Sequence, residues 1–192
     1  MKPESLVIAG QHTTVNVFLT STTTRNTIAR QTKKGLEMSD QKRRELSFSN
    51  WEEVIADIEK LASSEHETIG SHSFGKIVQH LATTNQMVVG NITPPKLPWF
   101  MRLAMPFLKK GILSNPVEPG FKLPNPAMQE FFWSQTDIDP KEAVENFRAS
   151  VEVYKAKGPL AVHPIFGKAT KEQVEKLTLS HAAMHLSFVN PK

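Results

Sequence analysis

Four segments of the chain place apolar residues at the three- and four-residue spacing of one face of an α-helix. The first begins at Ser49, with Glu52 three residues later in the capping-box position, and ends at the polar run 63–65. Its apolar face consists of Trp51, Val54, Ile55, Ile58, Leu61 and Ala62. The pattern therefore predicts a helix from residue 49 to about residue 62.

The second segment starts near Ser73 and runs to about Gly90, because Pro94 and Pro95 cannot continue a helix. Its apolar positions are Phe74, Ile77, Val78, Leu81, Val88 and Val89. The third segment has Asp139 as N-cap and Pro140 at the first helical position, and Gly158–Pro159 ends it. Its apolar positions are Ala143, Phe147, Val151 and Tyr154.

The fourth segment has Thr170 as N-cap and Gln173 in the capping-box position, and it closes at Asn190–Pro191. Its stripe consists of Val174, Leu177, His181, Met184, His185 and Phe188. Two histidines thus occupy positions where the helical pattern calls for apolar side chains. We expect this stripe to face the protein interior.

About 48 residues, 91–138, separate the second and third helices, and eight of the thirteen prolines lie between Pro94 and Pro126. That length is far greater than a normal helix–helix turn and is typical of a crossover between non-antiparallel neighbours in a bundle. The stretch Trp99–Lys110 has the pattern of a short amphipathic helix. We expect its apolar face to pack over the bundle rather than lie on a membrane surface. The predicted fold is an all-α bundle.

Composition narrows the possible chemistry. The absence of cysteine from the sequence excludes disulfides, thiolate zinc sites, iron–sulfur clusters and cysteine nucleophiles. The net charge of +4 lies mostly in residues 1–37, which carry five Lys or Arg and two Asp or Glu. The rest of the chain has no basic surplus typical of a nucleic-acid partner. No apolar run is long enough for a membrane span, and we expect a cytoplasmic protein.

Residues 1–37 are rich in Ser and Thr and lack a sustained apolar pattern. We expect them to be a disordered tail or an artefact of the assigned translation start, because the stretch from Met38 looks like a normal protein start. The folded domain is therefore predicted to span residues 38–192. A chain truncated to begin at Met38 should then be as stable as the full chain.

Histidine is the chemistry that the sequence offers. His181 and His185 are four residues apart, so both rings lie on one helix face within reach of one metal ion. His80 lies in the middle of the second helix, beside its buried face, where a bundle can bring it opposite the pair. A metal would give all three imidazoles a partner. The alternative is a set of hydrogen-bonded core histidines.

The remaining histidines point less clearly to a site. For His72 and His163, helix capping or loop hydrogen bonding is favoured over a place at a pocket mouth. His12 and His66 are predicted to be exposed to solvent. Other polar and aromatic side chains are unranked candidates for lining a pocket: Gln79, Glu130, Trp133 and Tyr154.

Several motifs together resemble the DinB-like (YfiT-type) metalloprotein superfamily, in a branch that is described as a domain of unknown function. They are Arg-Arg-Glu-Leu-Ser-Phe (43–48), Ser-Phe-Gly-Lys-Ile-Val-Gln-His-Leu-Ala (73–82), Gly-Phe-Lys-Leu-Pro (120–124), His-Pro-Ile-Phe-Gly-Lys-Ala-Thr (163–170) and His-Ala-Ala-Met-His-Leu-Ser-Phe (181–188). The resemblance covers roughly 150 residues. It implies a four-helix bundle in up-down-down-up order with a long crossover after the second helix.

The resemblance also implies a metal site made of one histidine on the second helix and a His-x-x-x-His pair on the fourth. His80, His181 and His185 occupy those positions. Relatives with known roles transfer low-molecular-weight thiols, and the resemblance suggests a homodimer. The His-Pro-x-Phe-Gly segment and the proline-rich crossover depart from those relatives, so a substrate cannot be transferred to this chain.

Three imidazoles with an open fourth position are typical of a catalytic zinc site, and nickel or iron(II) accept the same ligands. The leading hypothesis is a metal-dependent thiol transferase acting on a small molecule, because a metal deprotonates a bound thiol. A metal-dependent hydrolase is the second possibility. A non-catalytic binding or stress-response module, with a structural or vestigial metal, is the rival from another class. A bundle without metal is the simplest interpretation.

Overall fold

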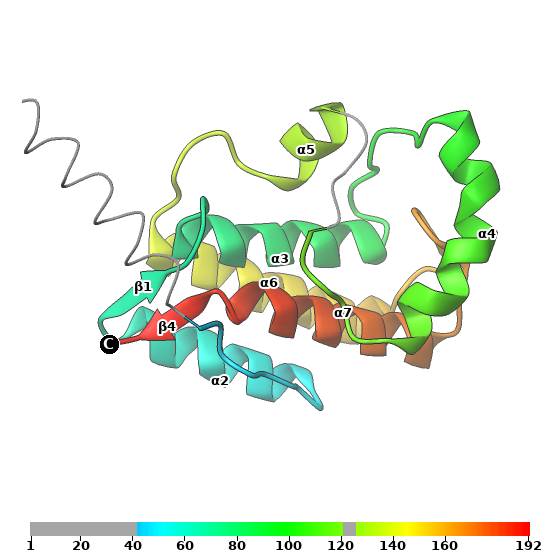
Figure 1. Ribbon diagram of the computed structural model, residues 1–192. Coiled ribbons are helices and arrows are strands. Elements are labelled where there is room, and N and C mark those ends of the chain that lie inside the picture. Colours follow the sequence, from blue (N-terminus) through cyan, green and yellow to red (C-terminus); the bar gives the residue numbers. More distant parts are fainter. Residues whose placement is uncertain (1–41, 121–125) are drawn as a thin grey trace, which may run out of the picture. The chain divides into compact units, whose positions relative to one another are not determined.

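The computed structural model describes residues 42–120 and 126–192, and the account below concerns these parts of the chain. The predicted tail at residues 1–37 and His12 lie outside them. The described chain is mostly helical, with four short strands, which is consistent with the predicted all-α class (Figure 1). Within these residues, no helix combines the length and the apolar character needed to cross a membrane.

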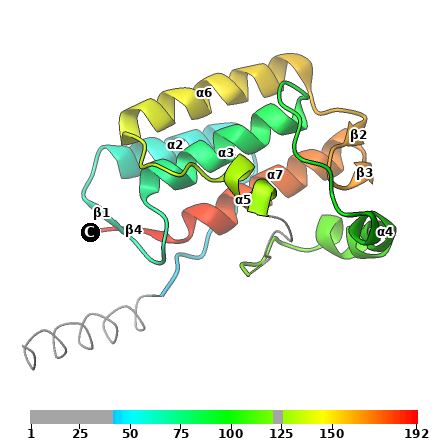
Figure 2. The same ribbon diagram turned by 90° about the horizontal axis from the view of Figure 1, so that it is seen from above.

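The four predicted helices are present as α2 (Trp51–Ala62), α3 (Phe74–Val88), α6 (Pro140–Lys157) and α7 (Lys171–Leu186). Helix α3 packs most extensively against α6, α2 contacts both α6 and α7, and α7 also contacts α3. Figure 2 shows these helices running alongside one another. Their shared core includes fully buried side chains from each of them: Val54, Ile58, Val78, Phe147, Val151, Val174 and Leu186.

Two of the three predicted N-caps are confirmed and the third is displaced by one residue, while the predicted start near Ser73 is itself an N-cap. Ser73, Asp139 and Thr170 cap α3, α6 and α7 with their side chains. Helix α2 is capped by Asn50, whose side chain accepts from the Glu53 backbone N–H, so the prediction of Ser49 is wrong. The segment Ser-Asn-Trp-Glu-Glu offers two registers with an acidic residue at the third position. In the Asn50 register Trp51 opens the helix and is buried, and Glu52 pairs with Lys155 of α6.

The crossover between α3 and α6 contains two helices. Helix α4 (Trp99–Ser114) extends the predicted amphipathic segment, while α5 (Pro126–Phe132) was not predicted. Helix α4 contacts α7 and α5 contacts α3. The expected packing of α4 is confirmed in part: Met105 and Leu113 are buried, but Trp99, Phe100 and Phe107 are exposed. The two helices of the crossover therefore contact two of the four main helices, α7 and α3.

Glycine is required where α3 begins. Gly75 is buried, and a Cβ atom there would collide with the backbone carbonyl oxygen of Ile138, just before α6. Glycine lacks this atom, so the first turn of α3 approaches the chain leading into α6 closely. The contact fixes the first turn of α3, and His80 projects from the same helix about one and a half turns further on.

Four short strands form two small antiparallel pairs that the helical pattern did not predict. β1 (His66–Thr68) pairs with β4 (Val189–Pro191), with Glu67 opposite Asn190. β2 (Val162–His163) pairs with β3 (Gly167–Lys168). Both pairs are too short for a hydrophobic alternation to show in the sequence. The first pair joins the segment between α2 and α3 to the residues after α7, and the second makes the tight turn that leads into α7.

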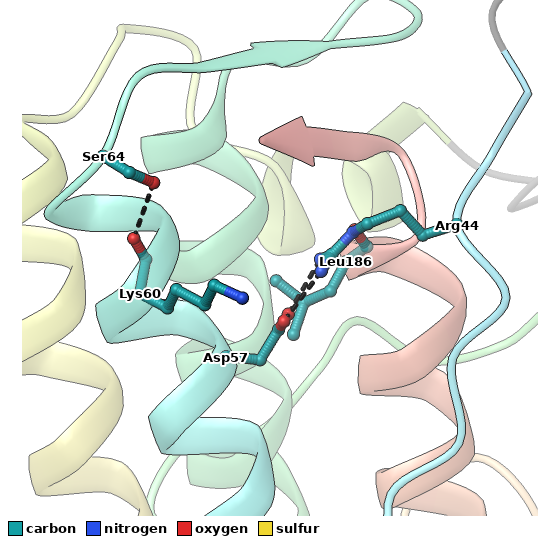
Figure 3. Close-up of polar contacts among 5 residues, drawn as sticks. All are labelled: Arg44, Asp57, Lys60, Ser64 and Leu186. Atoms are coloured by element: carbon teal, nitrogen blue, oxygen red, sulfur yellow. Dashed lines mark hydrogen bonds and ion pairs between the residues drawn. The ribbon is translucent and has the colours of Figure 1, made fainter. Parts of the chain in front are cut away.

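An arginine ties the segment before α2 to two helices (Figure 3). The Arg44 guanidinium donates two hydrogen bonds to the Asp57 carboxylate of α2, at 2.7 and 2.8 Å, and one to the Leu186 carbonyl of α7, at 3.0 Å. The Arg44 backbone N–H also donates to the Ser187 carbonyl oxygen. Both side chains are largely buried, so this forked ion pair is shielded from solvent.

Candidate metal centre and its cavity

Three histidines from two helices converge at one point. His80 projects from α3, and His181 and His185 project from successive turns of α7. The Nε2 atom of His181 lies 3.3 Å from that of His80 and 3.0 Å from that of His185. One ligand nitrogen from each ring lies within 4.8 Å of the others. Metal–nitrogen bonds of about 2.0–2.1 Å at tetrahedral angles place nitrogens roughly 3–3.5 Å apart, so the cluster has the dimensions of a metal site.

The surrounding backbone fixes the tautomer of His80. Its Nδ1 lies 3.0 Å from the Phe132 carbonyl oxygen, which can only accept a hydrogen bond. The proton of the neutral ring is therefore on Nδ1, and Nε2 presents a lone pair to the cluster. A carbonyl group that orients a histidine in this way is typical of metal-ligating imidazoles.

The cluster lacks a good arrangement of hydrogen bonds without an ion. Because the Nε2 atom of His80 carries a lone pair, it can only accept. A proton on the Nε2 atom of His181 can be donated well to His80 or to His185, but not to both. The Nδ1 of His181 is buried and has no partner among the described residues. One divalent ion would give all three Nε2 atoms a partner at once, so the donor set fits a metal.

The protein environment keeps the three rings neutral, which is the form that binds a metal. Burial lowers the pKa of His80 to about 4, even though its bond to the Phe132 carbonyl opposes the shift. Burial and the adjacent His80 lower the pKa of His181 to about 3. Burial, then His181 and His80, lower the pKa of His185 far below its ordinary value. Desolvation is the largest cause in each case.

An aromatic stack holds His80 from the side. The Trp133 indole lies flat against the His80 ring, with centroids 4.1 Å apart, and against the His72 ring on its other face, at 3.8 Å. The interplanar angles are 3° and 8°. Trp133 follows α5, so the crossover contributes directly to the position of a candidate ligand. Burial and the nearby Lys76 lower the pKa of His72, which keeps this stack uncharged.

The cluster opens on a cavity of about 930 Å³. Side chains from α3 and α7 form part of its wall, and the rest comes from residues 69–72, the end of α4, residues 116–120, α5 with Trp133, the β2–β3 turn and Phe188. Most lining side chains are apolar: Ile69, Ile77, Met87, Val88, Ile112, Pro116, Val117, Pro119, Phe132, Trp133, Ile165, Phe166, Leu177, Met184 and Phe188. A mostly apolar cavity of this size with a few convergent polar groups is typical of a small-molecule site.

The histidine face of α7 forms the cavity wall and is not part of the helix–helix core. Leu177, Met184 and Phe188 are only partly buried and line the cavity, as do His181 and His185. The core face carries a different set of residues: Val174, Leu179, Ala182 and Leu186. Of the predicted stripe, only Val174 therefore lies in the core. Leu177, Met184 and Phe188 are apolar because they line the cavity, and the two histidines lie between them on the same wall.

The other predicted pocket residues divide into two groups. Trp133 lines the cavity, as predicted. His72, for which capping or loop hydrogen bonding is favoured by the sequence, also lines the cavity, and its ring stacks on Trp133. Tyr154 does not, because its ring is buried against Trp51 in the core.

Two further candidates lie elsewhere. The Gln79 amide oxygen accepts a hydrogen bond from Asn146 at the surface. Glu130 is exposed on α5 and is not part of the lining, although its neighbour Gln129 is. The α3 and α5 faces that reach the cavity are thus those of His80 and Phe132, respectively.

The predictions for the non-cluster histidines need correction. His66 is partly buried and not exposed: its Nδ1 lies 2.8 Å from the Leu61 carbonyl oxygen, and its ring packs against Phe74. Its place in β1, beside the last strand, explains the burial, and no local pattern indicates it. His163 makes the predicted loop hydrogen bonds and also lines the cavity.

Together, the fold and the site define a mostly helical protein in which a histidine cluster opens on an apolar cavity. The chain belongs to the family described as "Protein of unknown function (DUF1569)", whose model matches residues 40–192. Comparison with curated proteins and with solved structures gave no match. The family match covers every element of the cavity wall.

Proposed function

We propose that this protein is a metal-dependent enzyme that acts on a small molecule bound in the cavity, with His80, His181 and His185 as the ligands of one divalent ion. The observation that carries the proposal is the convergence of three neutral imidazoles at the wall of a cavity large enough for a substrate. The DinB-like resemblance and its four-helix, up-down-down-up arrangement support the same assignment.

A divalent ion held by His80, His181 and His185 would supply a Lewis acid that lowers the pKa of a bound thiol or water molecule. Zinc is the first choice for three imidazoles with an open position, and nickel or iron(II) are alternatives. Thiol transfer to an electrophile and hydrolysis both use this chemistry, and both need only one open position.

The chain's own residues have defined tasks in this scheme. The Phe132 carbonyl and the Trp133 indole hold the His80 ring so that its Nε2 faces the cluster. The α7 backbone sets the spacing of His181 and His185. Apolar side chains around the cluster exclude water, which strengthens electrostatic interactions with a bound substrate.

Metal titration of the full chain tests the proposal. The protein is stripped with a chelator and titrated with Co²⁺, whose visible absorption reports coordination geometry, and then with Zn²⁺, Ni²⁺ and Fe²⁺. We expect one ion per chain with the intense bands of four-coordinate Co²⁺. His80→Ala, His181→Ala and His185→Ala should each lower the affinity at least tenfold.

His66→Ala is the matched control, since it removes a partly buried histidine far from the cluster in sequence and should leave binding unchanged. A wild-type chain that binds none of these ions would contradict the metal site. If the loaded protein binds its ion but turns over neither thiol–electrophile pairs nor activated esters, the non-catalytic binding module is the better assignment.

A further inference from the structure

His163 is a polar residue of the cavity wall outside the histidine cluster. The residue is 4% exposed and lines the cavity from the β2–β3 turn. Its Nδ1 accepts hydrogen bonds from the backbone N–H groups of Ile165, at 3.1 Å, and Phe166, at 3.2 Å. Because a backbone N–H can only donate, Nδ1 must carry a lone pair. The proton of the neutral ring is therefore on Nε2.

Among the side chains and backbone groups that the structure describes, none accepts a hydrogen bond from that Nε2–H. The ring cannot rotate to satisfy it, because two backbone donors hold the opposite edge and Phe166 packs on its face with centroids 4.9 Å apart. The result is a fixed donor without a partner on a nearly buried residue of the cavity wall. A donor held in this way at a cavity wall is free to bond an acceptor atom of a ligand, and its fixed orientation favours a ligand that presents that atom there.

The ring also stays neutral. Burial, together with the Lys109 ammonium group, lowers the pKa of His163 to about 4. Protonation would place a hydrogen on Nδ1, directly opposite two N–H groups. The group therefore acts as an uncharged donor, which suits an uncharged acceptor such as a carbonyl, ester or ether oxygen.

The rest of the lining points to the same ligand class. Among its described residues there is no Lys or Arg, and Glu118 is the one carboxylate. A ligand with several charges along its body would bury them without partners, which is unfavourable in an apolar cavity. Only the end that reaches the proposed metal ion would find a compensating charge.

We propose that His163 is a ligand-binding residue whose Nε2–H donates to an uncharged oxygen of an otherwise apolar small molecule held in the cavity. That this small molecule is the substrate rests on the proposed function, but its binding by His163 does not require the metal. The ligand thus has an apolar body and a neutral oxygen that His163 recognises.

A pair of probes that differ in one oxygen tests this assignment: 2-acetylnaphthalene and 2-ethylnaphthalene. Their dissociation constants are measured by displacement of Nile red from the full chain, stripped of metal and loaded with Zn²⁺. The quantity of interest is the ratio of the two constants, compared between wild type and variants as a double-mutant cycle.

Two substitutions separate the nitrogens of the ring. His163→Asn keeps an acceptor near the Nδ1 position for the turn but removes the cavity donor, whereas His163→Gln places an amide N–H near the Nε2 position. We expect His163→Asn to lower the preference for the acetyl probe by about three- to tenfold in the stripped protein, and His163→Gln to retain most of it. Thr178→Val is the matched control, because that cavity hydroxyl already donates to the Val174 carbonyl.

The proposal is overturned if the His163→Asn ratio equals that of wild type, if Thr178→Val changes the ratio as much, or if wild type binds neither probe. Binding of 2-ethylnaphthalene by His163→Asn within twofold of wild type shows that the cavity is intact. Should His163→Asn fail to fold, retention of the preference by His163→Gln supports the assignment and its loss overturns it. The metal titration does not depend on the ratio of the two dissociation constants. A failure of the proposed metal site can therefore be distinguished from a failure of the His163 assignment.

Discussion

At the scale of single residues, backbone groups decide what each imidazole can do. In His80, the carbonyl oxygen beside Nδ1 keeps the ring proton on Nδ1, so Nε2 carries a lone pair. In His163, two backbone N–H groups donate to Nδ1, so the proton is on Nε2 and this atom is a donor. The same side chain thus becomes a candidate metal ligand in one place and a candidate ligand donor in another. Sequence identifies the histidine, but only the fold supplies the group that fixes its tautomer.

The depressed pKa of His163 predicts a pH dependence of stability. The pKa is about 4 in the folded chain against an ordinary value of 6.5, so the unfolded chain binds more protons between these values. The stabilising difference is complete above about pH 6.5 and is lost as the pH falls toward 4. Relative to His163→Asn, wild type should lose on the order of 3 kcal/mol of unfolding free energy across this window.

Urea unfolding at several pH values, with chelator present so that the histidine cluster is metal-free in both proteins, measures this loss. Unfolding free energies of wild type and His163→Asn that run parallel from pH 7 to pH 4 would falsify the prediction.

At the scale of elements, the helix starts follow from local chemistry when the choice of cap is unique. Thr170 and Gln173 bond reciprocally, with the Thr170 side chain accepting from the Gln173 N–H and the Gln173 side chain accepting from the Thr170 N–H. At α2, two adjacent residues were equally good by spacing, and burial of Trp51 selected Asn50. Local rules therefore locate a helix start to within a residue, and packing settles the register.

Removal of the caps gives the element-scale prediction. Thr170→Ala and Asn50→Ala should each lower the free energy of unfolding by about 1 kcal/mol, because each leaves a backbone N–H of the first turn without its partner. Ser49→Ala should change the free energy of unfolding by less than about 0.5 kcal/mol. The reason is that Ser49 contributes only its backbone N–H, which donates to the Glu53 carboxylate. Chemical denaturation measures all three. Equal losses for Ser49→Ala and Asn50→Ala would show that the cap is assigned to the wrong residue.

At the scale of the whole molecule, contacts between distant parts of the chain assemble both the domain and its cavity. Arg44 joins the segment before α2 to α2 and to the end of α7. The crossover contributes Phe132 and Trp133 to the site, and β2–β3 contributes His163. The candidate site thus depends on at least four segments that are remote in sequence.

The Arg44–Asp57 pair predicts how strongly the domain depends on such contacts. Asp57→Ala leaves a largely buried guanidinium without its counter-charge and should lower the free energy of unfolding by about 2–3 kcal/mol. Glu45→Ala breaks the exposed pair with Lys42 and should cost less than about 1 kcal/mol. Denaturant unfolding compares them, and similar losses for the two variants would contradict the proposed importance of the buried pair.

Sequence alone determined the elements whose signals are local. Helical spacing located α2, α3, α6 and α7, and the i, i+4 histidines of α7 were placed on one face by the geometry of the helix itself. The pattern of α3 also placed His80 beside the buried face of that helix, and the resemblance implied the same residue as the partner of the pair. These features depend on residues within a turn or two of one another, so a single segment contains the information.

Tertiary structure decided which environment each face meets. Leu177, Met184 and Phe188 looked like core residues but line a cavity, because both environments select apolar side chains and the periodicity is the same in each. The burial of His66, the short strand pairs and the role of Trp133 also arise only when remote segments meet. A helical pattern shows that a face avoids water, but the distance to the opposing segment determines whether the space beyond that face is filled by side chains or open to a ligand.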